Sequence, residues 1–216
     1  PFYGGTPSPE RSLFWFAYNA NKRGITLDLP QPLGQDTFRR LAKTADFILE
    51  SFPPGYLDSL GLGYRALSAI NPRLIVASVT PFGQTGPYAG YKAAELVTWA
   101  KGGYMSLCGD ADRPPVWVSV PQADLHAGAE AATACMVAHS HRERTGEGQH
   151  IDVSAQECAV VVTANAWVHF LGAGFLMRRS GSRYINPLTG AAQAYYFPCR
   201  DGMVFIWLGG GGLAAD

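Results

Sequence analysis

Three charged residues stand at the starts of two predicted helices, where an acid or a base could take part in chemistry. Asp124 opens a segment of small residues that predicts a helix running to about Arg144. The free amides and positive dipole end of a helix would favour its ionised carboxylate, so a plain helix N-cap explains Asp124 as well. Lys92 and Glu95 lie three residues apart in a helix predicted from about 92 to 101. On one helix face they could form only a solvated ion pair, worth a few tenths of a kcal/mol.

Other patterns that could bind a metal or a nucleotide do not have the context they need. His139 and His141 are two apart on a predicted helix and so point to different faces, and His126 is distant in sequence. The letters of Gly61 to Ala66 match a dinucleotide fingerprint, but the residues before them predict a helix rather than a strand. The four cysteines show no CxxC spacing. We therefore expect no metal site, no nucleotide redox cofactor and no disulfide framework.

Composition excludes several classes of protein. Lys plus Arg and Asp plus Glu both number 17, so the formal charge is zero and gives no field that would attract nucleic acid. Cys158 to Met177 is long and apolar, but Asn165 and His169 favour a buried core helix over a membrane span. The chain opens on Pro1 without a visible signal peptide. We expect a cytoplasmic excerpt of a longer chain.

The elements that must position the charged residues alternate between strands and helices, which is typical of an α/β layer architecture. Gly and Pro residues fill a loop at 81–90 after the clearest buried strand, and such a loop is a usual place for a site. Residues 178–216 predict a linker and two strands around the turn Arg200-Asp201-Gly202. We expect residues 1–177 to form part of a large Rossmann-like domain and residues 178–216 to begin a smaller one. The strands are predicted at 25–29, 47–49, 74–79 and 149–153, and the helices at 34–44, 56–70 (two pieces, broken at Gly61 and Gly63), 92–101, 124–144 and 158–177.

Several stretches, read together and in order, resemble the family III CoA transferases, a group that includes formyl-CoA, carnitine and bile-acid CoA transferases and related racemases. The resemblance covers residues 18 to about 160, and each motif is weak alone. The matching stretches are NKRGITLDL (21–29), ADFILESFPPG (45–55), LGLGY (60–64), NPRLI (71–75), FGQTGPY (82–88), Asp124 with its small-residue helix, and RTGEGQHIDVS (144–154).

The resemblance implies a role for each of the charged residues. Asp124 corresponds to the nucleophile, which forms an acyl anhydride and then an aspartyl-CoA thioester. Glu95 corresponds to an acidic residue beside it that helps to order the site. The expected CoA contacts are Lys92, Phe52, Lys22 and Arg23. The implied substrates are an acyl-CoA and a small carboxylic acid, with no tightly bound cofactor, in an interlocked homodimer of a chain about twice this length.

Two other functions stay open. In the racemase branch a His followed by an acidic residue moves the proton, but that His position is Ala94 here, which disfavours an acyl-CoA racemase or isomerase. A non-catalytic CoA-binding module would also fit, because the family's opening segment and C-terminal half are not in this sequence. The usual Asn beside Phe52 is Ser51, and Gly209 to Gly212 cannot be assigned to the family's glycine-rich loop.

Overall fold

A three-stranded parallel sheet forms the centre of the fold, with strand order β1-β2-β3. The computed structural model describes residues 1–118, 120–186 and 189–206. Strands β1 (Phe47–Glu50), β2 (Ile75–Thr80) and β3 (His150–Ser154) all run the same way, in a register that pairs Glu50 with Ser78 and Thr80 with Ser154. Their carboxyl ends therefore meet at one edge of the sheet. The predicted α/β fold is confirmed, and these three strands lie within one residue of their predicted bounds.

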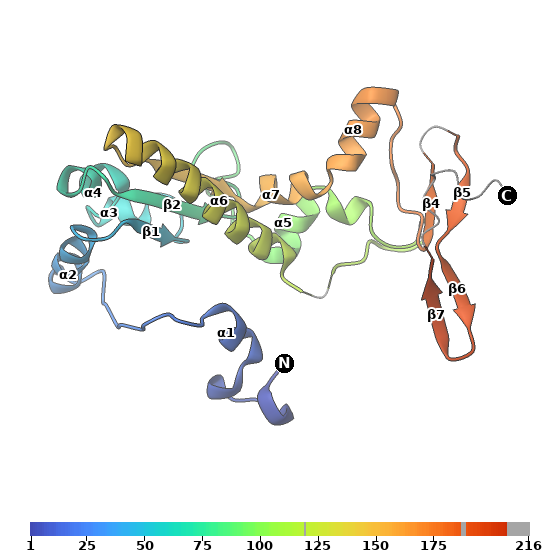
Figure 1. The fold of residues 1–216 in the computed structure, drawn as a ribbon, viewed down its shortest axis with the longest axis horizontal. Coiled ribbons are helices and arrows are strands. Elements are labelled where there is room, and N and C mark those ends of the chain that lie inside the picture. The colour runs from blue at the N-terminus through green and yellow to red at the C-terminus, as the bar shows by residue number, and fades with distance from the viewer. Residues whose placement is uncertain (119, 187–188, 207–216) are drawn as a thin grey trace. The chain divides into compact units, whose positions relative to one another are not determined.

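Helices connect the strands and cover the sheet (Figure 1). The prediction of two helical pieces in residues 56–70 is confirmed, because the chain turns at Gly61 with a positive φ of 64°. Gly61 to Ala66 follows helix α3, whereas a dinucleotide fingerprint must follow a strand, so this segment is not one. The α-helices are α1 (Leu13–Tyr18), α2 (Pro32–Ala42), α3 (Tyr56–Ser59), α4 (Tyr64–Ile70), α5 (Glu95–Lys101), α6 (Gln122–Thr145), α7 (Ala155–Val162) and α8 (Ala164–Ala173), and the 3-10 turns are η1 (Tyr3–Gly5), η2 (Pro9–Arg11) and η3 (Tyr104–Ser106).

Helix α6 packs closely on the sheet through a stripe of small side chains. Its buried residues are Ala123, Ala127, Ala131, Cys135, Ala138 and Arg142. These residues recur every three or four positions, so they lie on one helix face. The stripe contacts Ile75 and Ala77 of β2 and Val153 of β3. Small side chains let the helix backbone approach the sheet, which sets the position of both helix ends.

The C-terminal end of α6 is held at the opposite edge of the sheet by one buried arginine. Arg142 is 3% exposed, and its Nη1 donates to the carbonyl oxygens of Asp46 and Arg73, both at 3.1 Å. Its Nη2 lies 2.8 Å from His139 Nδ1, and its guanidinium packs over the ring of Phe47. Asp46 and Arg73 precede β1 and β2, so α6 runs antiparallel to the strands.

The chain divides into two compact units, Pro1–Phe38 and Arg39–Asp216. In the first unit, Ser12 caps α1 by accepting a hydrogen bond from the Trp15 amide at 3.1 Å. The strand expected at 25–29 is wrong, since residues 22–28 carry no regular secondary structure and Ile25 is 71% exposed. A strand requires a partner for its amides and carbonyls, and no described strand pairs with this segment. The division at residue 177 stays a prediction.

The apolar segment 158–177 is two helices rather than one buried core helix. Thr163 separates α7 from α8, and its hydroxyl donates to the Val160 carbonyl at 2.8 Å, a local bond that competes with helix continuation. Helix α7 buries Cys158 and Ala159, whereas no residue of α8, which is described throughout, is buried. The prediction of a core helix is therefore wrong for α8. None of the described helices is long and apolar enough to span a membrane.

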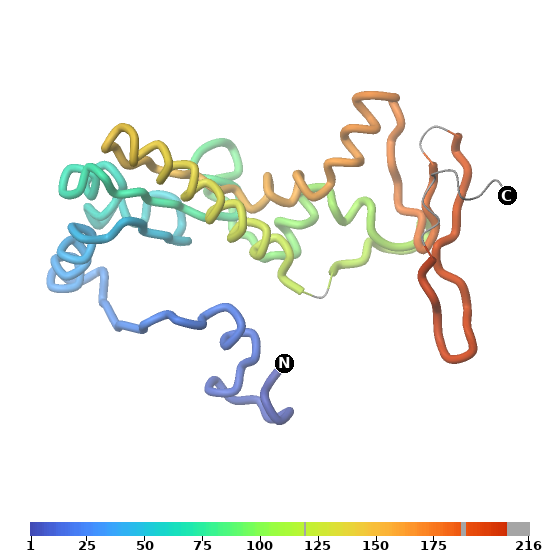
Figure 2. Tube along the Cα trace, viewed as in Figure 1, coloured from blue at the N-terminus to red at the C-terminus, as the bar shows by residue number. Residues whose placement is uncertain are grey.

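Two antiparallel pairs follow α8. Strands β4 (Arg183–Ile185) and β5 (Ala192–Ala194) form the first pair, and β6 (Tyr196–Cys199) and β7 (Gly202–Phe205) form the second. Figure 2 shows the chain folding back between β6 and β7. This hairpin confirms the two strands predicted around Arg200-Asp201-Gly202. Residues Gly209 to Gly212 lie outside the described residues.

Candidate active site

A cavity of about 450 Å³ lies at the carboxyl edge of the parallel sheet. Each of its walls comes from the start or end of an element. Ser51 follows β1, Thr80 ends β2 and Pro81 begins the next loop, while Ala94 and Glu95 start α5 and Asp124 lies in the first turn of α6. The carboxyl edge of a parallel sheet is the usual place for a ligand site. The two carboxylates predicted from the sequence are thus brought into one cavity.

Asp124 is the third residue of α6, so the interpretation of Asp124 as a helix N-cap is wrong. Pro121 occupies the N-cap position and makes no side-chain capping hydrogen bond. The first turn begins earlier because the amide of Ala123 is bound by another carboxylate, that of Glu95. Part of the Asp124 surface reaches solvent. Removal from water, and secondly the negative charge of Glu95, raise the pKa of Asp124 above its usual range.

Glu95 is held by two hydrogen bonds, one to each carboxylate oxygen. Its Oε1 accepts from the Ala123 amide at 3.1 Å, and its Oε2 accepts from the indole Nε1–H of Trp117. Glu95 is the first residue of α5, after Ala94 in an extended conformation. The arrangement places a fixed negative charge beside Asp124 and ties the start of α5 to the start of α6.

Of the predicted CoA contacts in the second unit, neither Lys92 nor Phe52 lines the cavity. Lys92 is exposed in the loop before α5, so the expected helical pair with Glu95 is wrong, because the extended backbone at Ala94 delays the helix. Phe52 is 39% exposed and its ring packs on Tyr56 at 4.9 Å. Lys22 and Arg23 belong to the first unit, where Lys22 Nζ donates to the Tyr18 carbonyl at 2.9 Å.

Thr80 is a site residue that the sequence did not single out. It is 3% exposed, lines the cavity, and its hydroxyl has no hydrogen-bond partner among the described residues. A buried unpaired hydroxyl is costly, so a partner supplied by a bound ligand would stabilise the complex. The available signal was its place directly after the clearest predicted strand, 74–79, and directly before the Pro81 loop.

The loop after β2 is anchored by Asp152 of β3. Both carboxylate oxygens of Asp152 accept from the Gln84 amide, at 3.0 and 2.9 Å. Gly83 turns the chain there with a φ of 83°, which favours glycine. The Pro81 carbonyl accepts from the Gln156 amide at 3.0 Å. These bonds fix the loop where it borders the cavity.

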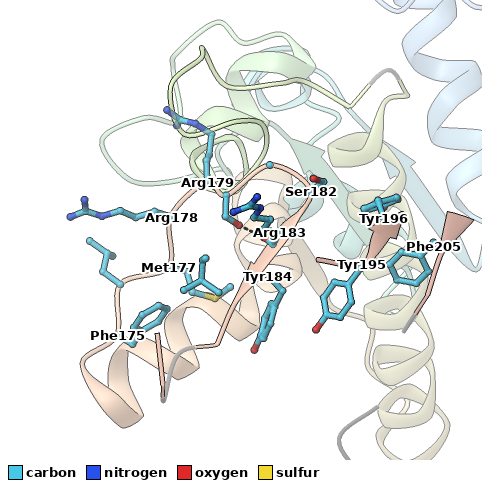
Figure 3. A pocket seen from close by; sticks show the side chains of 14 residues that line it. Phe175, Met177, Arg178, Arg179, Ser182, Arg183, Tyr184, Tyr195, Tyr196 and Phe205 are labelled. Carbon is cyan, nitrogen blue, oxygen red and sulfur yellow. Dashed lines mark hydrogen bonds between the residues drawn. The ribbon is translucent and has the colours of Figure 1, made fainter. Parts of the chain in front are cut away.

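A second cavity, of about 470 Å³, lies between residues 175–185 and the strands β6 and β7 (Figure 3). Five of its fourteen lining residues are aromatic, namely Phe175, Tyr184, Tyr195, Tyr196 and Phe205. The side chain of Arg178 points away from these rings (Figure 3). None of the predicted site residues lines this cavity, and no carboxylate does. The cavity at the sheet edge is therefore the candidate active site.

The candidate active site has no visible arrangement for a metal. Across the described ranges, no group of three or more His, Cys, Asp and Glu side chains could hold an ion. His139 bonds to Arg142, and His141 lies 3.3 Å from the hydroxyl of Thr145. The polar side chains that line the candidate active site are the carboxylates of Glu95 and Asp124 and the hydroxyls of Ser51, Thr80 and Thr98.

The fold and the site define an α/β protein with two carboxylates, Glu95 and Asp124, in a cavity at the carboxyl edge of a parallel sheet. The family model for CoA-transferase family III matches residues 2–215. The chain therefore belongs to CoA-transferase family III, as the sequence motifs indicated.

Named relatives and a solved structure support this assignment. The chain is 38% identical to the succinyl-CoA:(R)-benzylsuccinate CoA-transferase subunit BbsE of Thauera aromatica, over 95% of this chain and 48% of the relative. It is 35% identical to the succinate–glutarate CoA-transferase of Agrobacterium fabrum, over 92% of this chain and 49% of the relative. A crystal structure of a CAIB/BAIF family protein from Brucella suis matches with a TM-score of 0.76 at 38% identity, over 84% of this chain and 47% of that one. The chain spans about half the length of these relatives.

Proposed function

We propose that the protein transfers CoA from an acyl-CoA to a carboxylic acid, with Asp124 as the nucleophile. The observation that carries the proposal is the placement of Asp124, beside a fixed Glu95, in a cavity at the carboxyl edge of the sheet. Family membership gives the reaction class. The acceptor is proposed to be a small carboxylic acid, and succinyl-CoA is a first donor to test because it occurs in the names of several relatives.

The proposed reaction conserves the energy of the thioester through covalent steps. A carboxylate oxygen of Asp124 attacks the thioester carbonyl, the C–S bond breaks, and CoA leaves as a thiolate. The thiolate attacks the aspartyl carbonyl of the anhydride, which releases the donor acid and forms aspartyl-CoA. The acceptor carboxylate then attacks this thioester, again releasing the thiolate. A last attack of the thiolate on the acceptor's acyl carbon gives the new acyl-CoA and restores Asp124.

The environment of Asp124 fits a nucleophilic carboxylate. A raised pKa means a more basic oxygen, which is a stronger nucleophile once it is ionised. Exclusion of water by the bound substrates would also limit hydrolysis of an anhydride. The site residues Lys92, Phe52, Lys22 and Arg23 remain the proposed CoA contacts, and a cytoplasmic homodimer remains the proposed state of the protein.

A mass-spectrometric exchange assay on the intact native protein tests the proposal. Acyl-CoA donors are mixed with a panel of carboxylate acceptors, and new acyl-CoA is measured. Formation of new acyl-CoA supports the transferase. Proton exchange beside the thioester carbonyl without transfer would favour the racemase or isomerase, although Ala94 lacks the imidazole that this reaction uses. CoA binding without either reaction would favour a non-catalytic binding module.

Thr80→Val should reduce kcat/KM by about 10-fold, because the buried hydroxyl would no longer donate to a substrate oxygen. The change keeps the side-chain shape, and it should leave the thermal midpoint unchanged or higher because an unpaired buried hydroxyl is removed. Thr133→Val, on the exposed face of α6, is the matched control. Equal rates for wild type and Thr80→Val would remove Thr80 from the site.

Glu95→Gln should move the acid limb of the pH–rate profile to lower pH. Asp124 reacts as the carboxylate, and because its pKa is raised the wild-type limb should lie above about pH 3.9, the usual aspartate value. Removing the negative charge of Glu95 lowers that pKa, while burial, the larger cause, persists. Profiles of kcat/KM for wild type, Glu95→Gln and the exposed control Glu130→Gln measure the shift. A limb that stays in place, or moves up, contradicts the proposed electrostatic role.

A further inference from the structure

Trp117 contacts the candidate site without lining it. It lies within residues 114–118, which carry no regular secondary structure, and 43% of its surface is exposed. Trp117 is not among the buried core residues, so core packing alone does not explain its position. Its indole Nε1–H donates to Glu95 Oε2, and this is its specific polar contact with the site.

Glu95 is in turn linked to the proposed nucleophile through the backbone of Ala123, the residue before Asp124. The other oxygen of Glu95 accepts from the amide of Ala123, the second residue of α6, at 3.1 Å. Ala123 is fully buried and packs with Trp99 and Ala159. Asp124 is the next residue along the chain. The orientation of the Glu95 carboxylate is therefore set from both sides, by the indole and by the helix amide.

We propose that Trp117 is a positioning residue of the CoA-transfer site, which orients Glu95 through its indole N–H and thereby holds the first turn of α6 and Asp124 in the reactive arrangement. This inference rests on the proposed function for its kinetic consequence, but the indole–carboxylate bond itself does not depend on the reaction. With only one oxygen bound, the Glu95 carboxylate can rotate about its side chain. A nucleophile displaced by a fraction of an ångström loses much of its rate.

The position of Trp117 predicts which kinetic constant changes. Because the indole is not part of the cavity wall, its loss should leave substrate binding largely intact. Trp117→Phe keeps an aromatic ring and removes the donor. We expect kcat to fall by about 10-fold while KM for the acyl-CoA changes by less than about 2-fold. Trp167→Phe, the same change at an exposed tryptophan of α8, should leave both constants unchanged.

A double-mutant cycle with Glu95→Gln tests whether Trp117 acts through Glu95. If it does, adding Trp117→Phe to Glu95→Gln should cost much less than in the wild type, since the coupling partner is already altered. Additive losses would show that Trp117 acts by another route. A rise in KM with kcat unchanged would make Trp117 a substrate contact and overturn the proposal.

Two further measurements separate failure of this inference from failure of the proposed function. In protein labelled with ¹⁵N-tryptophan, the indole N–H resonance that disappears in Trp117→Phe should move upfield in Glu95→Ala, whatever reaction the protein catalyses. An unmoved resonance rejects the bond even if transfer activity is present. If Trp117→Phe is poorly folded, incorporation of 3-benzothienylalanine at 117 replaces only the N–H by sulfur. Full kcat in that protein would also reject the inference.

Discussion

Replacement of Asp124 by alanine in the intact native protein is expected to abolish CoA exchange, with a loss of at least about 1,000-fold in kcat. The reaction is proposed to run through two covalent adducts on this carboxylate, and alanine offers no atom that could form either. Glu95 cannot replace it, because both of its oxygens are already bound to Ala123 and Trp117. The measurement is the yield of new acyl-CoA by mass spectrometry, with the donor and acceptor that serve the wild type best.

The control for Asp124→Ala is Glu130→Ala, which removes an exposed carboxylate from the same helix. The control should keep wild-type exchange, and both variants should bind CoA. Trapping adds a direct test, since hydroxylamine should convert residue 124 of donor-treated wild type to a hydroxamate. Exchange by Asp124→Ala within about 10-fold of wild type would refute the covalent mechanism.

Asp124→Ala should abolish activity without lowering the free energy of unfolding at neutral pH. The pKa of Asp124 is raised in the folded protein, so between its unfolded and folded values the folded state binds more protons than the unfolded state. The free energy of unfolding of the wild type therefore falls as pH rises through this window. Asp124→Ala lacks this loss and should be no less stable than wild type at neutral pH. Reduced activity in this variant would then not be explained by unfolding.

Arg142→Met should lower the free energy of unfolding by about 2–4 kcal/mol. Methionine keeps an apolar stem of similar length, but the carbonyls of Asp46 and Arg73 each lose the guanidinium donor at 3.1 Å, while the Asp46 carbonyl keeps the Ile75 amide at 3.2 Å. The packing of the guanidinium over the Phe47 ring is lost as well. Urea denaturation of the intact protein, read as the midpoint and slope, gives the change.

The matched control is Arg144→Met, two residues along α6, where the side chain is exposed. Its free energy of unfolding should stay within about 0.5 kcal/mol of the wild type. Equal midpoints for Arg142→Met and Arg144→Met would show that the buried hydrogen bonds contribute nothing to net stability. A midpoint that is lowered with a changed slope would indicate an altered unfolded state.

The sequence predicted the parts of the fold that depend on local hydrophobic runs. Residues 74–79 are almost continuously apolar, as expected of a central parallel strand, and the structure has β2 at Ile75–Thr80. The helix after Asp124 was predicted from its run of small residues to extend to about Arg144, and the structure has α6 at Gln122–Thr145. Both carboxylates of the candidate site were named through the family resemblance, because the local patterns around them favoured only a helix N-cap and a solvated ion pair.

The errors concern features that depend on partners distant in sequence. A strand at 25–29 needs a neighbour, and none of the described strands pairs with it. The start of α6 is set by Glu95, a contact 28 residues away that no local rule contains. Trp117 lies in a proline-rich segment without periodicity, so its bond to Glu95 had no local signal. The split at Thr163 was missed because threonine within an apolar run looks like a tolerated helix residue.

The alanine stripe of α6 also limits how this protein can vary over evolutionary time. Asp124 and Arg142 lie roughly 27 Å apart along the helix, at about 1.5 Å per residue, and the stripe between them rests directly on β2 and β3. A larger side chain at Ala127 or Ala131 would lift the whole helix and carry the carboxylate out of its cavity. Sequence drift should therefore concentrate on the outward face of α6, while the inward face stays restricted to the smallest residues.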